Sequence, residues 1–192
     1  MSPMTSRRRS TIAAELRPEK ITAVVDSREQ CPLDLTPLQT VTGTLTTGDY
    51  SIRGLEHVVA IERKSLGDLL SCVGRERERF DREIRRLLGY PVRAVIVEAS
   101  WDDLERGEWR GDLSPEQVIG SVLGWNAAGV PVLPVGDRQR ASRYVTRLLV
   151  TAAKRRWREA RLLVQTVTDD EGAAESVEAG QPPEPFTQGD AA

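Results

Sequence analysis

An apolar run that ends in three charged residues constrains the fold of this chain more than any other feature. Val58 to Ile61 is typical of a buried strand, and Glu62, Arg63 and Lys64 follow it without a break. Because alternate residues of a strand share a face, Glu62 and Lys64 should project together while Arg63 points the other way. Burying such charges is costly unless they are paired or bind a metal. The run therefore predicts a sheet strand that carries a charged site.

A second acid precedes this run. Asp49 follows Gly48, and the turn expected at Arg53-Gly54 would fold the two segments into a hairpin that brings Asp49 close to Glu62. Two carboxylates can hold Mg²⁺ (or Mn²⁺), which keeps several waters and accepts phosphate oxygens. A neighbouring Lys64 can orient or deprotonate an attacking water, or stabilise charge on the phosphorane. The pattern predicts a metal site that cuts phosphodiesters.

Hydrophobic patterning along the rest of the chain indicates alternating strands and helices. We expect strands at 21–25, 40–52, 57–64, 92–99 and, at the sheet edge, 130–135. Amphipathic helices should begin at Ser65, near Arg75, at Ser114 and at Asp137, with a loop over 101–112. This order predicts a mixed α/β domain.

The motifs resemble those of a known family. Gly-Asp-Tyr at 48–50, Ile-Glu-Arg-Lys at 61–64 and then Asp68 look like the nuclease domain of XPF/Mus81 structure-specific endonucleases, a branch of the PD-(D/E)XK superfamily. The resemblance extends upstream to 25–29 and downstream through 74–77 to 94–98. It implies an α/β, restriction-endonuclease-like fold, a central mixed sheet flanked by helices. It also implies DNA cleavage that leaves 5′-phosphate and 3′-hydroxyl ends.

The resemblance also assigns roles to Asp26, Arg28 and Glu29. In isolation, this segment reads as a strand-end turn with a surface ion pair. By resemblance, Asp26 and Glu29 would support the metals that Asp49 and Glu62 bind, and Arg28 would contact the scissile phosphate. Arg63 would be a structural or phosphate-positioning partner.

Asp68 and two arginines have competing interpretations. Ser65 and Asp68 have the spacing of a helix N-cap and its third residue, so Asp68 is either a cap or a catalytic acid. Arg75 and Arg77 would contact DNA phosphates by resemblance. The alternative is a solvated amphipathic helix whose acids pair with its arginines.

Charge and composition divide the chain into three parts. The 192 residues have a net charge of -2, but the seven acids and no bases after residue 165 leave 27 bases against 22 acids, a net of +5, in residues 1–165. We expect a flexible basic arm at 1–19, the nuclease domain at 20–165 and an acidic disordered tail at 166–192. A single histidine excludes multi-histidine zinc sites, and two cysteines exclude a disulfide framework.

Together these features predict a DNA endonuclease of bacterial or phage type, cutting branched, flapped or single-strand/double-strand junction DNA in repair or recombination. No segment approaches the ~20 apolar residues of a membrane span, and no signal peptide is evident, so we expect a cytoplasmic, nucleoid-associated protein. The C-terminal helices could form a homodimer interface. Two alternatives are a non-catalytic DNA-binding or scaffold subunit and a sequence-specific restriction-type nuclease.

Overall fold

A six-stranded mixed sheet forms the centre of the protein. The computed structural model describes the backbone of residues 13–178 and the side chains of residues 13–167. The strands are β1 (Thr22–Asp26), β2 (Gln39–Gly43), β3 (Tyr50–Ile52), β4 (Val59–Ser65), β5 (Val92–Glu98) and β6 (Val132–Pro134). Their order across the sheet is β2-β1-β3-β4-β5-β6, and β3 is antiparallel to both of its neighbours while the other pairs are parallel. The expected mixed α/β fold is confirmed.

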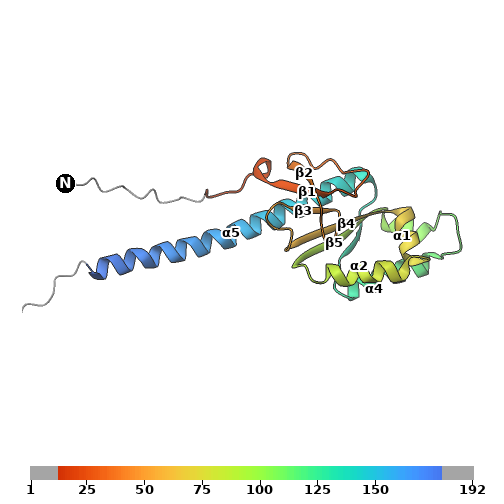
Figure 1. Ribbon diagram of the computed structural model, residues 1–192. Helices are drawn as coiled ribbons and strands as arrows, with labels where there is room; N and C mark the ends of the chain where they lie inside the picture. The colour runs from red at the N-terminus through yellow and green to blue at the C-terminus, as the bar shows by residue number, and fades with distance from the viewer. Residues whose placement is uncertain (1–12, 179–192) are drawn as a thin grey trace, which may run out of the picture. The chain divides into compact units, whose positions relative to one another are not determined.

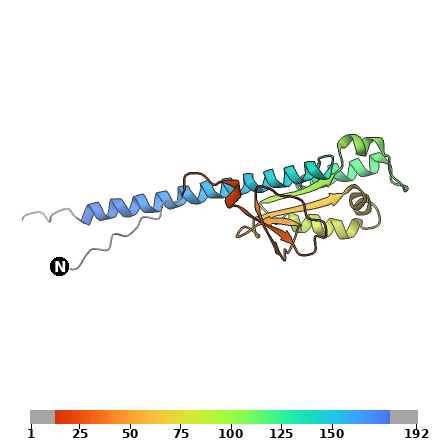
Figure 2. The same cartoon turned by 90° about the horizontal axis from the view of Figure 1, so that it is seen from above.

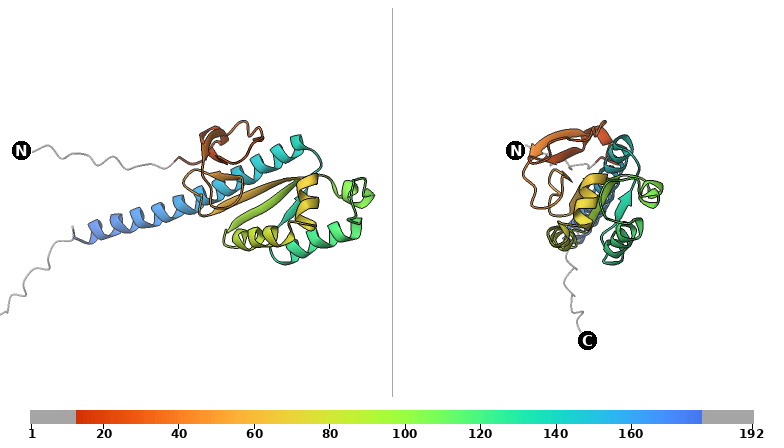
Figure 3. Two further views of the ribbon diagram at one scale, coloured as in Figure 1. Left: turned by 45° about the vertical axis from the view of Figure 1, so that its right-hand side comes forward. Right: turned by 90° about the vertical axis from the view of Figure 1, so that its right-hand side faces the viewer.

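Helices cover both faces of this sheet (Figure 1). In chain order they are α1 (Leu66–Val73), α2 (Arg77–Leu87), α3 (Trp101–Arg106), α4 (Pro115–Ala127) and α5 (Arg138–Glu178), after a short 3-10 turn, η1 (Pro18–Lys20). On one face Val145 and Leu149 of α5 pack with Ile61, whereas on the other Phe80 of α2 and Val122 of α4 pack with the sheet. The strand β4 passes directly into α1 (Figure 3), so the charged end of β4 lies beside the helix start.

The segment between Gly43 and Tyr50 corrects the prediction of one strand over 40–52. The chain leaves the sheet after β2 because the backbone N–H of Leu45 donates to the buried Asp26 carboxylate at 2.7 Å, which replaces a ladder bond. It returns at Asp49, whose carbonyl accepts from the Asp26 N–H at 2.8 Å. The predicted hairpin of β3 and β4 is confirmed.

The expected loop over 101–112 was also wrong in part, because it contains α3. Ser100 and Asp103 form a capping box, in which the Ser100 hydroxyl accepts from the Asp103 N–H and the Asp103 carboxylate accepts from the Ser100 N–H. Trp109 beyond the helix donates its indole N–H to the Leu113 carbonyl at 2.9 Å. A helix of only six residues is too short to show a clear apolar period in the sequence.

The two ends of the domain are more ordered than their composition predicts. Leu16, expected in a flexible arm, packs against the core, and residues 1–12 lie outside the described part of the chain. Helix α5 is one continuous ribbon in Figure 2 and runs to Glu178, so residues 166–178 are helical where we expected disorder. Ala and Glu, which are good helix formers, occupy five of these thirteen positions. Residues 179–192 lie outside the described residues.

By compactness, Ala13–Arg155 form one unit, and α5 from Arg156 onward belongs to a second. The predicted boundary at residue 165 is therefore ten residues beyond the end of the compact unit. None of the helices described within residues 13–178 combines the length and the apolar character that a membrane span requires.

Candidate active site

Asp49 and Glu62 lie close together because the backbone just before β3, at Gly48 and Asp49, packs directly against the backbone of Ile61 in β4. The Asp49 N–H donates to the Ile61 carbonyl at 2.8 Å, and the Asp49 carboxylate accepts from the Arg63 N–H at 2.8 Å. Gly48 makes this approach possible: its φ is +80°, and a Cβ there would lie 3.0 Å from the Ile61 carbonyl oxygen. A side chain at this position would be strained and crowded at once.

Alternation along β4 separates its three charges as predicted. Lys64 forms an ion pair with Glu62 on one face. On the other face the Arg63 guanidinium donates to Glu98 through Nε at 2.7 Å and Nη2 at 3.1 Å, and its Nη1 lies 3.5 Å from Glu29. The hydrogen bonds to Glu98 outweigh burial and raise the pKa of Arg63. Arg63 is thus fixed by its own partners, apart from Glu62 and Lys64.

Burial disfavours the ionised form of the two site carboxylates, Asp49 and Glu62. Glu62 is only 4% exposed, and burial followed by the charge of Asp49 raises its pKa well above the ordinary value. Burial also raises the pKa of Asp49 to about 6, against the lowering effect of the Arg63 N–H. Burial lowers the pKa of Lys64, but the charges of Glu62 and Glu83 outweigh it, so the net shift is upward and the ammonium form is favoured.

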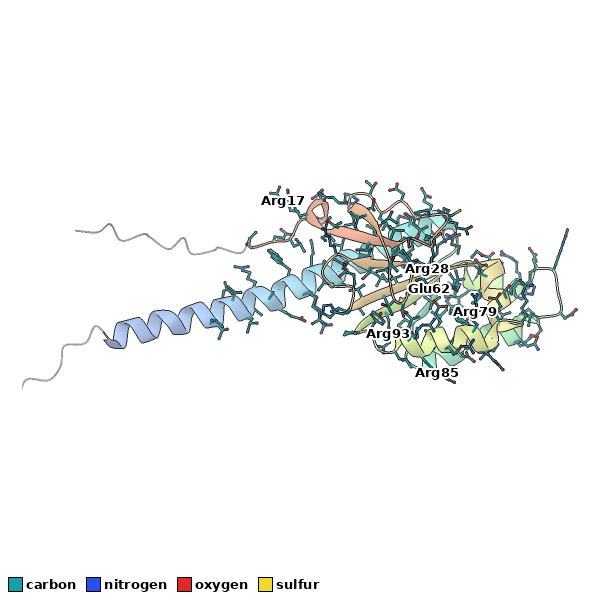
Figure 4. All side chains as sticks on the ribbon, in the orientation of Figure 1. Arg17, Arg28, Glu62, Arg79, Arg85 and Arg93 are labelled. Carbon is teal, nitrogen blue, oxygen red and sulfur yellow. The ribbon has the colours of Figure 1, made fainter. Side chains whose placement is uncertain are left out.

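These groups line a cavity of about 190 Å³ between the sheet and α2. Helix α2 contributes Arg79, Glu83 and Arg86, which share the cavity lining with Asp49, Glu62 and Lys64. Figure 4 shows Arg28, Glu62 and Arg79 in the same region of the molecule. The cavity therefore combines buried carboxylates with cations from three separate segments, an arrangement that suits a phosphate bound beside a metal.

Asp26 and Arg28 also line this cavity, but their side chains are hydrogen-bonded to each other. The Asp26 carboxylate, 2% exposed, accepts from Arg28 Nε at 2.7 Å and Nη2 at 3.1 Å, and from the N–H groups of Arg28 and Leu45. The side-chain bond to Arg28 is the main cause that lowers the pKa of Asp26 to about 2. Glu29 is different: it accepts from the Cys31 N–H at 2.7 Å and is not part of the cavity lining.

Comparisons with known proteins show the family of the chain and its fold. Residues 16–148 match the ERCC4 domain, more than two thirds of the chain. The chain belongs to the ERCC4-domain family. Its fold is also similar to XPF from Aeropyrum pernix, with a TM-score of 0.56 and 19% identity over 68% of this chain. The alignment covers 61% of that XPF chain, less than two thirds of its length. Comparison with curated protein sequences gives no match.

The ERCC4 domain is an XPF/Mus81-type nuclease domain, as the sequence motifs predicted. Nucleases with this domain generally depend on divalent metals, so the donor set can be tested for fit. Asp49 and Glu62 are hard oxygen donors whose mutual repulsion a cation would relieve. Among the described residues no three acid, histidine or cysteine side chains have metal-ligand placement. Mg²⁺ commonly takes one or two carboxylates and completes its shell with water and phosphate, so the two carboxylates fit.

The other predicted residues of the ERCC4 domain lie at or beyond the edge of this cavity. Asp68 is exposed at the start of α1, where its N–H and carboxylate both bond the Ser65 hydroxyl, at 3.1 and 2.7 Å. This is the geometry of a cap, and Asp68 is not part of the cavity lining. Arg75 is exposed, whereas Arg77 donates to Ser121 at 2.7 Å and lies 5.0 Å over the Trp125 ring.

Sequence reasoning missed three charged cavity residues of this ERCC4 domain: Arg79, Glu83 and Arg86. Their spacing of four and then three residues places them on one face of α2, beside the buried stripe of Phe80, Ile84 and Leu87. That spacing was available in the sequence. The many arginines and acids of this helix concealed it, because any of them can be assigned to a solvated ion pair.

Proposed function

We propose that the protein is a divalent-metal-dependent DNA endonuclease that cuts branched, flapped or single-strand/double-strand junction DNA in repair or recombination. The observation that supports this most is the buried pair Asp49 and Glu62, whose pKa values burial raises and which share one cavity with a lysine and three arginines. Such perturbed carboxylates in a cavity are typical of functional sites. The proposed products carry 5′-phosphate and 3′-hydroxyl ends.

The residues predicted at or beside the site have proposed parts in the reaction. Asp49 and Glu62 would hold Mg²⁺ or Mn²⁺, with Asp26 and Glu29 supporting the site. Bound there, the metal would act as a Lewis acid on the phosphodiester. Arg28, 69% exposed at its side chain, would contact the scissile phosphate while its Nε and Nη2 remain on Asp26. Lys64 would orient the attacking water and stabilise charge on the phosphorane.

Residues away from the cavity would serve as a frame and a DNA surface. Arg63 would fix the end of β4 through Glu98, and Asp68 would either cap α1 or assist the site. Arg75 and Arg77 line a wider hollow of about 700 Å³ next to the cavity, with Arg79 common to both. This hollow would receive the DNA backbone.

We also propose a homodimer through α4 and α5, supported by the exposed Leu123 and Tyr144. The location that we propose for the protein is the cytoplasm, at the nucleoid.

Labelled flap, fork, duplex and single-stranded DNA, each with Mg²⁺, Mn²⁺ or a chelator, test the proposal. We expect metal-dependent nicking of the flap and fork substrates and none in excess chelator. Glu62→Gln serves as the control for contaminating nucleases, because it keeps the shape of the side chain. Metal-dependent binding without cutting would favour a scaffold subunit, and sequence-dependent cutting of plain duplex would favour a restriction-type nuclease.

A further inference from the structure

Lys64 lies between two carboxylates, one of which no motif assigns. Glu62, on its own strand, forms the closer ion pair. The second is Glu83 of α2, whose Oε2 is 4.0 Å from the Lys64 Nζ. The Glu83 side chain is 19% exposed, and it lines the same cavity. Two carboxylates from different elements therefore face a single ammonium group, and of the two only Glu62 lies within hydrogen-bond distance.

Packing of α2 fixes the position of Glu83. Phe80, Ile84 and Leu87 are buried against the core, so the helix cannot rotate to take Glu83 out of the cavity. The Lys64 ammonium itself lies 5.3 Å from the centre of the Phe80 ring. The methylene stem of Lys64 and the face of α2 thus have few alternative arrangements.

Glu62 cannot serve Lys64 and a metal equally well. Its carboxylate is shared among the Lys64 ion pair, the repulsion of Asp49 and a contact with Glu83. A divalent ion held by Asp49 and Glu62 would compete with Lys64 for the Glu62 oxygens. The Lys64 ammonium would then have Glu83 as its remaining carboxylate partner, and misplacement by about 1 Å can lower a rate by about 100-fold.

We propose that Glu83 is a positioning residue, whose side-chain oxygen keeps Lys64 directed into the cavity when Glu62 turns to a divalent ion. This inference rests on the proposed function. It gives Glu83 the role of a hydrogen-bond acceptor for Lys64, not of a metal ligand, and the oxygen matters more than its charge.

Two substitutions separate the acceptor from the charge. Glu83→Gln keeps a side-chain oxygen, whereas Glu83→Leu has similar volume and no acceptor. We expect Glu83→Leu to lower the single-turnover cleavage rate by about 10- to 100-fold without changing the DNA Kd, and Glu83→Gln to stay within about threefold of the unsubstituted protein. Glu105→Leu, at an exposed position of α3 outside both the cavity and the hollow, is the matched control and should leave the rate unchanged.

A readout that does not need cleavage separates failure of this inference from failure of the proposed function. The Lys64 ammonium should give a ¹H–¹⁵N signal in Mg²⁺-loaded protein and in Glu83→Gln, because a held ammonium exchanges slowly, and the signal should be lost in Glu83→Leu. An unchanged Lys64 signal in Glu83→Leu overturns the inference even if no DNA is cut. Mn²⁺ titration adds a second check: a Kd weakened tenfold or more in both variants would make Glu83 a ligand and overturn the positioning role.

Discussion

The side chain of Asp49 is tied to the backbone of Arg63: its Oδ2 accepts the Arg63 N–H at 2.8 Å across the junction of β3 and β4. This bond fixes the carboxylate in the cavity while burial raises its pKa to about 6. The protein therefore holds an acid in a place where ionisation is unfavourable. The unfavourable ionisation of Asp49 should lower the free energy of unfolding at neutral pH.

Asp49→Asn should make metal-free protein more stable at neutral pH. The pKa of Asp49 rises from 3.8 in the unfolded chain to about 6 in the folded one, so the folded state binds more protons and stability falls as pH rises from about 4 to about 6. Asparagine keeps an oxygen for the Arg63 N–H and does not ionise. We expect the variant to gain about 1 to 3 kcal/mol above pH 6 and nothing below pH 4.

Urea unfolding at several pH values in chelator measures this difference. Parallel stability curves for the two proteins between pH 4 and pH 7 would contradict the prediction, because a constant gap cannot come from titration of Asp49. Adding Mg²⁺ should reverse the order, since the ion stabilises only a protein that binds it.

Glu62→Gln should abolish metal-dependent nicking while the fold survives. Glu62 is surrounded by the like charges of Asp49 and Glu83, so neutralising it removes repulsion as well as the pair with Lys64. We expect an unfolding free energy that is unchanged or higher, as for ligands of other sites that gather like charges. Circular dichroism during thermal unfolding measures the stability of the variant, and a nicking assay measures its metal-dependent cleavage. Loss of activity accompanied by loss of folding would refute this account of Glu62.

Lys64→Ala should separate chemistry from binding. Removal of one electrostatic interaction with the transition state typically costs about 100-fold or more, so the single-turnover rate should fall by roughly that factor. DNA affinity should change little, because Lys64 is largely buried and paired with Glu62. Rapid-quench kinetics and a binding titration on the same fork substrate decide the matter. A parallel fall of rate and affinity would make Lys64 a binding residue.

The sequence predicted the parts of this site that depend on local geometry. Alternation along β4 separated Glu62 and Lys64 from Arg63, and the hairpin brought Asp49 to them. It did not predict that Glu98 would hold Arg63, a contact across 35 residues that depends on the register of β4 against β5. Glu83 was missed for a different reason: α2 carries so many arginines and acids that the sequence does not show which of them face the cavity.

For the fold, too, local patterns were predictable from the sequence and contacts between distant residues were not. Strands with continuous apolar runs, such as β5, were evident, whereas the break between β2 and β3 depends on Asp26 taking the Leu45 N–H. For residues 166–178 composition predicted disorder, whereas α5 runs to Glu178. An acidic segment that cannot form a core can still continue a helix that begins inside one.

Arg75→Ala and Arg77→Ala should differ although both residues line the hollow beside the cavity. Arg75 is exposed, so its removal should weaken binding to all DNA sequences alike and reduce the salt slope by about 0.9 for each phosphate that the variant no longer neutralises, with stability unchanged. Arg77 donates to Ser121 at 2.7 Å and to Asp81 at 3.3 Å and lies over Trp125, so its removal should also cost about 1 to 2 kcal/mol of stability. Binding titrations at several salt concentrations and urea unfolding measure both effects. Base-selective loss of binding in either variant would contradict phosphate contact and favour a restriction-type nuclease, because phosphate contacts carry no base information.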